Sequence, residues 1–265
     1  MATEDSHPRQ PAPAGTLPGW SGRIPIDYHA GMCGRFNLRT PASELAAFFE
    51  IVFDSPLAET LVPRFNIAPS QPVLVIGSHA ENPSRTPMLV QWGLVPGWAK
   101  DPSLGTRMIN ARGETVAEKP SFRAAFRHRR CLVPATGFYE WQRTDGPRKQ
   151  PWHIHRRDEA PFAFAGIWEH WEAADGSVLQ SCAIITTSPN PLLTGIHDRM
   201  PVVLSPSNYD RWINPLHQDC ESLEALMVPC PTTELVADPV SDYVNRPGND
   251  GQRCVDPVQS PEDVG

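Results

Sequence analysis

Proline most constrains the fold of this chain, because 30 of its 265 residues are prolines that recur along its whole length. A proline inside a helix removes a backbone hydrogen bond and clashes with the preceding turn, and in a sheet it is confined to edges and bulges. The chain is therefore predicted to consist of loops and short strands rather than long helices. Its hydrophobic content of 40% is ample for a buried core.

The apolar runs between the prolines are short and rich in β-branched and aromatic residues, a composition typical of strands. We predict strands at 73–76, 88–94, 131–134, 137–142, 151–155, 162–169 and 181–187. Helices are predicted near 41–51, 112–128, 206–213 and 219–227. The predicted fold class is α+β, with a curved, barrel-like and mainly antiparallel sheet flanked by helices.

The composition divides the chain into three regions. Residues 1–31 combine five prolines with Gly, Ser and Ala and show no apolar period, which indicates a disordered extension or a start assigned too early. Residues 32–245 are predicted to form one domain, and 246–265 a polar C-terminal tail. No run of 18 apolar residues is present, so we expect no transmembrane helix.

The formal charge of −7 argues weakly against a nucleic-acid partner, but one segment differs from this average. Residues 107–130 hold seven Lys or Arg side chains against two Glu. Such a stretch is consistent with a phosphate-binding face. On charge alone, a solvated helix face is the more common explanation of such a stretch.

The six cysteines form no CxxC pair and lack the His spacing of a zinc site. Without an export signal a disulfide framework is not expected, and Cys131 and Cys182 stand in apolar runs typical of core thiols. We predict no metal and no cofactor.

The possible chemistry of the dipeptide Met32–Cys33 depends on whether the chain is processed before Cys33. An internal cysteine in a strand is usually structural. A cysteine at a free N-terminus instead carries an amine and a thiol on adjacent carbons, so an aldehyde can form a Schiff base with the amine, and the thiol can then close a thiazolidine ring. An α-amine with a pKa of about 7.7–8.0 is partly neutral at pH 7 and can act as the nucleophile.

Two further segments carry candidate acid–base groups. Strand alternation in 137–142 directs Phe138, Glu140 and Gln142 to one face and Tyr139 and Trp141 to the other. If Glu140 is on the buried face, its pKa rises and it can act as a general acid or base; otherwise it is a surface residue. In 195–201 a loop histidine, His197, can donate a proton or make a structural hydrogen bond.

The ordered motifs MCGRF, RFNIAPSQ, WGLVPGW, INARGET, CLVPATGFYEW, FAGIWE, ITTSPN and IHDRMPVVL resemble the SOS response-associated peptidase (SRAP) family over about residues 32–245. The resemblance implies a curved, mainly antiparallel sheet and a positively charged groove for single-stranded DNA that contains abasic sites. It also implies a cytoplasmic, nucleoid-associated protein of the DNA damage response, which we expect to be a monomer.

The resemblance implies a role for each of four catalytic residues. Cys33 matches the cysteine that forms the thiazolidine link with the ring-opened abasic sugar, and Asn110 matches an asparagine that orients its amine. Glu140 matches the acid/base carboxylate, and His197 matches a histidine that assists the Schiff-base steps. DNA contacts are expected from six further residues, namely Arg35, Arg112, Trp92, Trp141, Thr186 and Thr187.

The sequence departs from the family pattern at its start, because Cys33 follows 32 residues instead of one. An amide nitrogen cannot form a Schiff base, so we expect translation to begin at Met32 or the extension to be removed as a propeptide. Two other functions stay open. One is a cysteine peptidase that uses Cys33, His197 and Glu140, and the other is a single-strand binding module without catalysis.

Overall fold

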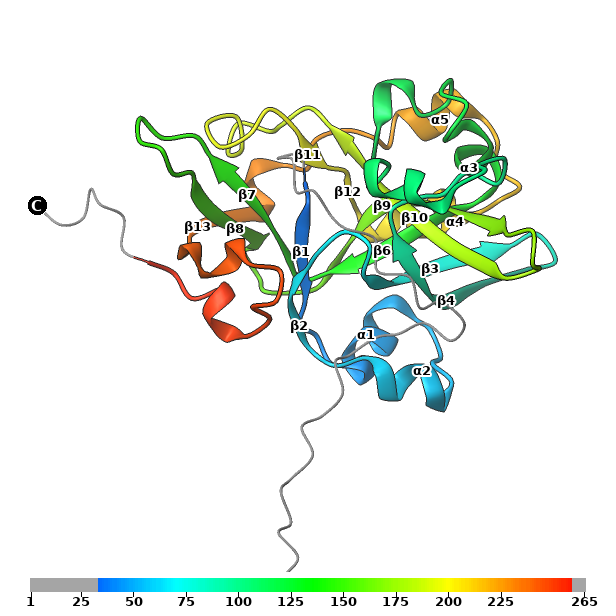
Figure 1. The fold of residues 1–265 in the computed structure, drawn as a ribbon, viewed down its shortest axis with the longest axis horizontal. Coiled ribbons are helices and arrows are strands. Elements are labelled where there is room, and N and C mark those ends of the chain that lie inside the picture. The colour runs from blue at the N-terminus through cyan, green and yellow to red at the C-terminus, as the bar shows by residue number, and fades with distance from the viewer. Residues whose placement is uncertain (1–32, 259–265) are drawn as a thin grey trace, which may run out of the picture.

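The computed structural model describes residues 33–258, and the predicted extension at 1–31 lies outside this range. Five strands form a closed barrel in the order β10 (Val178–Thr187), β4 (Asn82–Trp92), β3 (Pro72–His79), β6 (Arg130–Ala135) and β9 (Phe162–Glu172). The barrel closes because β9 and β10 pair along most of their length. Figure 1 shows this barrel beside a second, smaller sheet.

Short strands extend the barrel around β9 and β10. β5 (Asn110–Arg112) runs parallel to β10, as β4 does, and the other pairs of this sheet are antiparallel in the described residues. β11 (Met200–Pro201) pairs with β10, and β12 (Val203–Leu204) pairs with β9. The predicted α+β class with a mainly antiparallel, barrel-like sheet is therefore confirmed.

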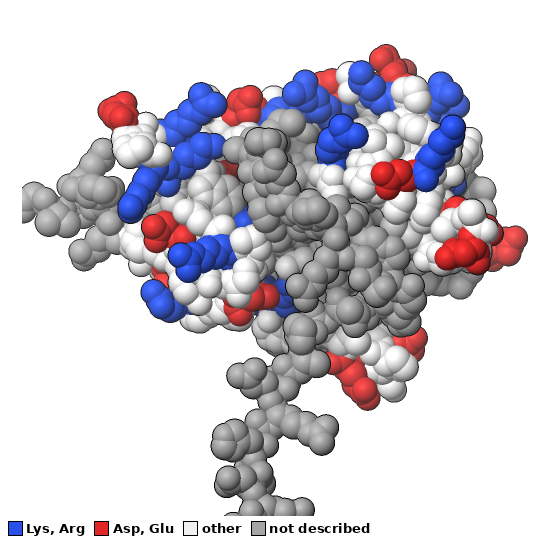
Figure 2. Space-filling model, in the orientation of Figure 1, with Lys and Arg blue, Asp and Glu red and all other residues white. Residues whose placement is uncertain are grey.

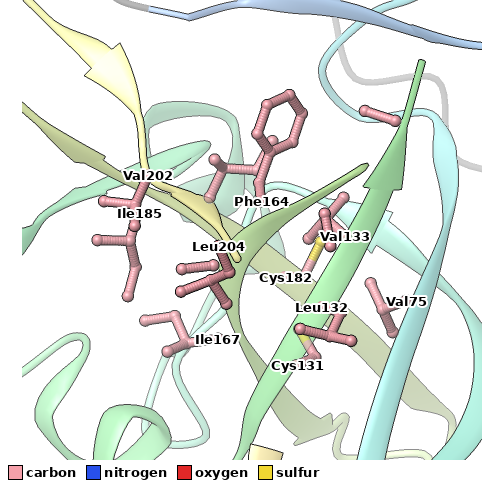
Figure 3. Close-up of a cluster of buried hydrophobic side chains, with 14 of the residues drawn as sticks. Val75, Cys131, Leu132, Val133, Phe164, Ile167, Cys182, Ile185, Val202 and Leu204 are labelled. Atoms are coloured by element: carbon pink, nitrogen blue, oxygen red, sulfur yellow. The ribbon is translucent and has the colours of Figure 1, made fainter. Parts of the chain in front are cut away.

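Apolar side chains from the barrel strands fill the interior. Figure 3 shows a cluster of them that includes Val75, Cys131, Leu132, Val133, Phe164, Ile167, Cys182, Ile185, Val202 and Leu204. β6 is buried on both faces, which explains why residues 131–135, after Arg130, are an uninterrupted apolar run rather than an alternating one. Cys131 and Cys182 are core residues, as the sequence predicted, and burial raises the pKa of both thiols.

The second sheet has the strand order β13 (Leu235–Pro239), β8 (Gln150–Arg156), β7 (Gly137–Gln142), β1 (Arg35–Leu38) and β2 (Arg64–Ile67). One face packs on the barrel through edge-to-face aromatic contacts: the ring centroid of Phe36 lies 5.2 Å from that of Trp92 and 5.8 Å from that of Phe164.

The other face of this sheet covers a small cluster formed by Tyr139, Trp141 and residues after β13. Phe138 instead belongs to the main core. The predicted alternation along β7 is therefore confirmed, with Phe138 and Glu140 on one face and Tyr139 and Trp141 on the other.

A close backbone approach fixes two glycines in the connection between β4 and β5. Gly93 has a φ of +128°, and a Cβ there would lie 2.7 Å from the carbonyl oxygen of Gly105. A Cβ on Gly105 would lie 2.5 Å from the carbonyl oxygen of Gly93. Neither position tolerates a side chain, because backbone cannot move aside as a flexible side chain can.

The helices are short: α1 (Ala42–Phe49), α2 (Ser55–Thr60), α3 (Arg123–His128), α4 (Tyr209–Ile213) and α5 (Cys220–Glu224). Single 3-10 turns are η1 (Pro102–Arg107), η2 (Gly113–Thr115), η3 (Pro206–Asn208), η4 (Thr232–Glu234), η5 (Asp242–Asn245) and η6 (Gln252–Cys254). The stretch predicted as helical over 112–128, with a break at or near Pro120, forms η2 before this proline and α3 after it. Within residues 33–258, no helix is long and apolar enough to cross a membrane.

The packed chain continues past residue 245, where the sequence prediction ended the domain. Asn66 Nδ2 donates to the carbonyl oxygens of Arg246 and Asn249, and Cys254 and Val255 are buried. The segment is polar, as predicted, but residues 246–258 are part of the fold, because the buried Asn66 of β2 donates to its backbone carbonyls and to the Asp250 carboxylate.

Candidate active site

The backbone nitrogen of Cys33 lies against the side chain of Glu140. The N–H group donates to Glu140 Oε1 at 2.9 Å, across 107 positions of sequence. β1 and β7 pair antiparallel, with Arg35 opposite Tyr139, so the start of β1 lies beside the end of β7. This pairing brings Cys33 next to Glu140. Cys33 has a φ of +42°, which is uncommon for a residue with a side chain and indicates a strained turn at this point.

Glu140 is a buried carboxyl group, with only 2% of its surface exposed. Burial raises its pKa, while His197 and the hydrogen bonds from Cys33 act in the opposite direction. His197 Nε2 lies 3.9 Å from Glu140 Oε2. A carboxyl whose pKa is raised toward neutrality can both accept and donate a proton at physiological pH.

His197 is positioned by the backbone that follows it. The Arg199 N–H donates to His197 Nδ1 at 3.2 Å. Nδ1 also lies 3.3 Å from the Arg199 carbonyl oxygen and 3.1 Å from Asp198 Oδ1, so it is surrounded by one donor and two acceptors. These contacts hold the ring with Nε2 facing Glu140. When Nε2 carries the proton, the imidazole can donate to an oxygen held between the two side chains.

Asn110 completes the group around Cys33. It begins β5, whose parallel pairing with β10 brings it beside the start of β1. Its Nδ2 donates to the carbonyl oxygen of Cys33 at 3.4 Å. The structure thus brings together all four residues that the sequence singled out as catalytic, and Asn110 and Glu140 contact opposite ends of the Cys33 backbone.

The Cys33 thiol is buried, and burial together with the negative charge of Glu140 raises its pKa well above its ordinary value. The sulfur is therefore a neutral thiol at physiological pH, and Glu140 is the adjacent group that can take its proton.

Arg199 was not predicted as a site residue but lies close to the site. Its guanidinium makes a bidentate ion pair with Glu114 at 2.5 and 2.8 Å and donates to the Thr186 carbonyl at 2.7 Å. Its positive charge favours the thiolate of Cys33. Its position in the same loop, two residues after His197, could have indicated it.

Thr186 and Thr187 are buried at the end of β10, where they pair with Pro201 and Met200. Their exposure is as low as that of Cys33 and Glu140, and their contact with DNA stays a prediction. They hold the strand from which the His197 loop departs.

Arg35 was expected to contact phosphate, but its guanidinium is buried. It donates to Asn66 Oδ1 at 2.9 Å and to the carbonyls of Val244 and Asn245 at 3.0 and 3.2 Å, and it lies 6.0 Å from the ring centroid of Trp141. Three main-chain and side-chain oxygens from distant parts of the chain surround the guanidinium, so Arg35 ties the start of β1 to the C-terminal segment. Trp141 is partly exposed beside it and donates from Nε1 to Asn245 Oδ1 at 2.7 Å.

Trp92 cannot offer a face to a base, because it is fully buried and donates from Nε1 to the Ile109 carbonyl at 2.9 Å. The exposed tryptophan of the same motif is Trp98, with 61% of its surface accessible. Its loop is held by a bond from Trp171 Nε1 to the Ala99 carbonyl at 2.7 Å. Position in the motif could have indicated this, since Trp98 follows a Pro–Gly turn whereas Trp92 ends an apolar strand.

The basic stretch at 107–130 divides into exposed and structural members. Arg112 is exposed on β5, next to Asn110. Arg130 is buried and donates to five carbonyl oxygens, and burial lowers its pKa to about 10. Arg129 pairs with Glu169 at 2.7 Å. The stretch is therefore not one continuous phosphate-binding face.

All six cysteines are free thiols. Across residues 33–258, no three side chains of His, Cys, Asp or Glu gather so as to hold a metal ion. The groups available at the site are therefore a carboxyl, an imidazole, an amide and the Cys33 thiol.

The family model described as SOS response associated peptidase (SRAP) matches residues 32–247. The chain is 43% identical over 225 residues to the abasic site processing protein YoqW of Bacillus subtilis, covering 85% of this chain and 99% of the relative. It is 34% identical over 234 residues to the abasic site processing protein YedK of Escherichia coli, covering 86% of this chain and all of the relative.

The fold is similar to a crystal structure of a protein from Bacteroides thetaiotaomicron, with a TM-score of 0.78 and 28% identity. That similarity covers 86% of this chain and all of the other. Sequence and fold agree over the same part of the molecule, which contains Cys33, Asn110, Glu140 and His197. The chain belongs to the SOS response associated peptidase (SRAP) family.

Proposed function

We propose that this protein captures abasic sites in single-stranded DNA through a covalent thiazolidine link to Cys33. The observation that supports this most is the 2.9 Å contact between the Cys33 nitrogen and the buried carboxyl of Glu140. An amine at that position is next to its own general base and next to its own thiol. Relatives at 43% and 34% identity are named abasic site processing proteins, which supports the same substrate.

The chemistry requires that the nitrogen of residue 33 be a free amine. Initiation at Met32 followed by removal of that methionine would supply it, and so would proteolytic removal of residues 1–32. Either route leaves the amine and the thiol on adjacent carbons of one residue, at the position where Glu140 accepts a hydrogen bond from the nitrogen.

In the first step the neutral amine attacks the aldehyde carbon of the ring-opened sugar, and Glu140 passes one nitrogen proton to the former aldehyde oxygen, which gives the hydroxyl of the carbinolamine. Glu140 then takes the second nitrogen proton and delivers it to this hydroxyl, which leaves as water and yields the neutral Schiff base. His197 Nε2–H donates to the sugar oxygen during these transfers.

In the second step the Cys33 sulfur adds to the imine carbon, and its proton passes through Glu140 to the nitrogen. One aldehyde, one amine and one thiol therefore give one thiazolidine and one water. Asn110 holds the Cys33 carbonyl, so the amine and the sulfur stay oriented toward the same carbon.

The described surface offers two aromatic side chains for unpaired bases. Trp98 presents an exposed indole on a fixed loop, and the partly exposed Trp141 directly follows Glu140 in β7. Exposed aromatic faces stack on unpaired bases of any sequence, and a cation such as Arg112 contributes phosphate affinity.

The test uses protein that begins at Cys33 and an oligonucleotide with one abasic site. We expect an adduct that survives a denaturing gel and is absent with the matching intact oligonucleotide. Cys33→Ala retains the amine but lacks the thiol, so it should form only a Schiff base that borohydride must trap. No adduct from the wild-type protein, with intact DNA still bound normally, would refute the proposal.

A second candidate is self-cleavage before Cys33, favoured by the strained φ of +42° at that residue and by the acid–base group at its nitrogen. Intact mass of the full chain distinguishes it. Loss of residues 1–32 from the wild type but not from Cys33→Ala supports self-cleavage, and equal processing of both proteins excludes it.

A further inference from the structure

A cavity of about 460 Å³ lies outside the site described above, within the segment that follows β13. Its lining includes Tyr243, Asn245, Arg246 and Arg253. Volumes of this size accommodate small ligands or one unit of a polymer. None of these residues was singled out in the sequence, and none contacts Cys33 or Glu140 in any hydrogen bond or ion pair described above.

The cavity carries uncompensated positive charge. Within residues 33–258, neither Arg246 nor Arg253 makes an ion pair, although both are exposed. The acid in the lining is Asp242, which is itself 4.0 Å from Arg148 of the β7–β8 hairpin. Figure 2 shows Lys and Arg side chains over the region where Figure 1 places this hairpin and the C-terminal segment.

One of the two guanidinium groups is held in place before any ligand arrives. Arg253 lies 4.4 Å from the ring centroid of Tyr243, a cation–π contact that restricts its long side chain. Asn249 Nδ2 donates to the Tyr243 carbonyl at 2.6 Å and fixes the backbone beneath it. A planar guanidinium held in this way suits the paired oxygens of a phosphodiester.

The cavity is connected to the Cys33 site through Trp141. Asn245 lines the cavity, and its Oδ1 accepts from Trp141 Nε1 at 2.7 Å. Trp141 directly follows Glu140 in β7, so the two side chains point to opposite faces of the sheet at the end of that strand. Trp141 therefore lies on the face of the sheet that carries the cavity, next in sequence to Glu140 on the other face.

We propose that the cavity is a subsite for the sugar-phosphate backbone of the same DNA strand, on one side of the abasic nucleotide, with Arg246 and Arg253 binding its phosphates. This inference rests on the proposed function. It assigns to the strand a path around the end of β7 and predicts that contacts on one side of the lesion are stronger than on the other.

The experiment measures binding and crosslinking with oligonucleotides extended stepwise on only the 5′ or only the 3′ side of the abasic site. In the wild type, extension on one side should increase affinity until the cavity is filled. The double variant Arg246→Ala/Arg253→Ala should lose that gain, and the slope of log K against log salt should decrease by about 0.7 for each lost phosphate contact. Arg157→Ala is the matched control, since this exposed arginine is outside the cavity and only donates to the Thr233 carbonyl at 3.4 Å.

Equal length dependence and equal salt slopes in the wild type and the double variant would overturn the subsite. Stabilisation by inorganic phosphate against heat, without any effect of strand length, would also overturn it by assigning the cavity to a free anion. Crosslinking to the shortest abasic oligonucleotide should persist in the double variant. Its absence from the wild type itself would instead refute the proposed function, so the two failures are distinguishable.

Discussion

Replacing Asn66 with Ala should destabilise the protein by removing a buried connection between three parts of the chain. Asn66 is fully buried in β2. Its Oδ1 accepts from Arg35 at 2.9 Å, and its Nδ2 lies within 3.1 Å of the carbonyls of Val244, Arg246 and Asn249. The side chain thus joins β2, the start of β1 and the C-terminal segment.

The magnitude follows from these bonds. The bond with the buried guanidinium of Arg35 is charge-assisted and contributes about 1.5–3 kcal/mol, and each neutral bond contributes about 0.5–1.5 kcal/mol. The amide has only two N–H groups for three carbonyls, and Val244 O keeps its bond from Arg35. We therefore expect Asn66→Ala to lower the free energy of unfolding by about 3–5 kcal/mol.

Urea unfolding measures this as a lower midpoint with an unchanged slope. The control is Asn208→Ala, since the Asn208 side chain makes no capping hydrogen bond and should change stability by less than about 0.5 kcal/mol. Asn66→Ala should also crosslink more slowly, because it removes a hydrogen bond that holds Arg35, two residues from Cys33. A loss below about 1 kcal/mol would show that the C-terminal segment does not depend on Asn66, and the reasoning would be refuted.

The remaining predictions concern Glu140, the two tryptophans Trp92 and Trp98, and Gly137. Glu140→Gln should slow crosslinking by about 10²–10⁴-fold in a single-turnover assay, because a general acid–base group is lost. Burial raises the pKa of Glu140 in the folded protein, so the wild type loses stability when Glu140 ionises as pH rises above the pKa of the unfolded state. Glu140→Gln should therefore be more stable than the wild type at neutral pH and equally stable in acid. Identical pH profiles of the two thermal midpoints would contradict this. Trp98→Ala should fold normally and lose about 1–3 kcal/mol of single-strand affinity, measured by fluorescence anisotropy. Trp92→Ala should instead lower the free energy of unfolding by about 3–5 kcal/mol, because Trp92 is a buried core residue. The opposite pattern would refute the assignment of Trp98 to DNA and of Trp92 to the core. Gly137→Ala should strongly lower the midpoint of thermal unfolding, because its Cβ would lie 2.2 Å from His153 Nε2 and 2.9 Å from the Ile154 carbonyl oxygen; a normal melting curve would show that β7 and β8 can separate locally.

The sequence predicted those features that depend on neighbouring residues. Alternation along β7 predicted that Phe138 and Glu140 share one face, and the structure shows that this face is buried. Short apolar runs predicted the barrel strands, because burial on one or both faces of a strand is visible in the local pattern. The motifs around Cys33, Asn110, Glu140 and His197 indicated four residues that the structure brings together, although their chemical roles stay predictions.

Long-range contacts decided the rest. Whether an arginine is a phosphate ligand or a buried structural group depends on its surroundings, and the partners of Arg35 are more than 200 residues away at Val244 and Asn245. The same is true of Trp92, which the aromatic cluster between the two sheets buries, while Trp98 on its loop stays exposed. By itself the sequence determined the longer strands and which residue types are available for chemistry, whereas the short strands β2, β5, β11, β12 and β13 were not predicted. Only the tertiary structure decided which polar side chains face Cys33, because desolvation and hydrogen bonding depend on every segment packed around a group and not on its neighbours in the chain.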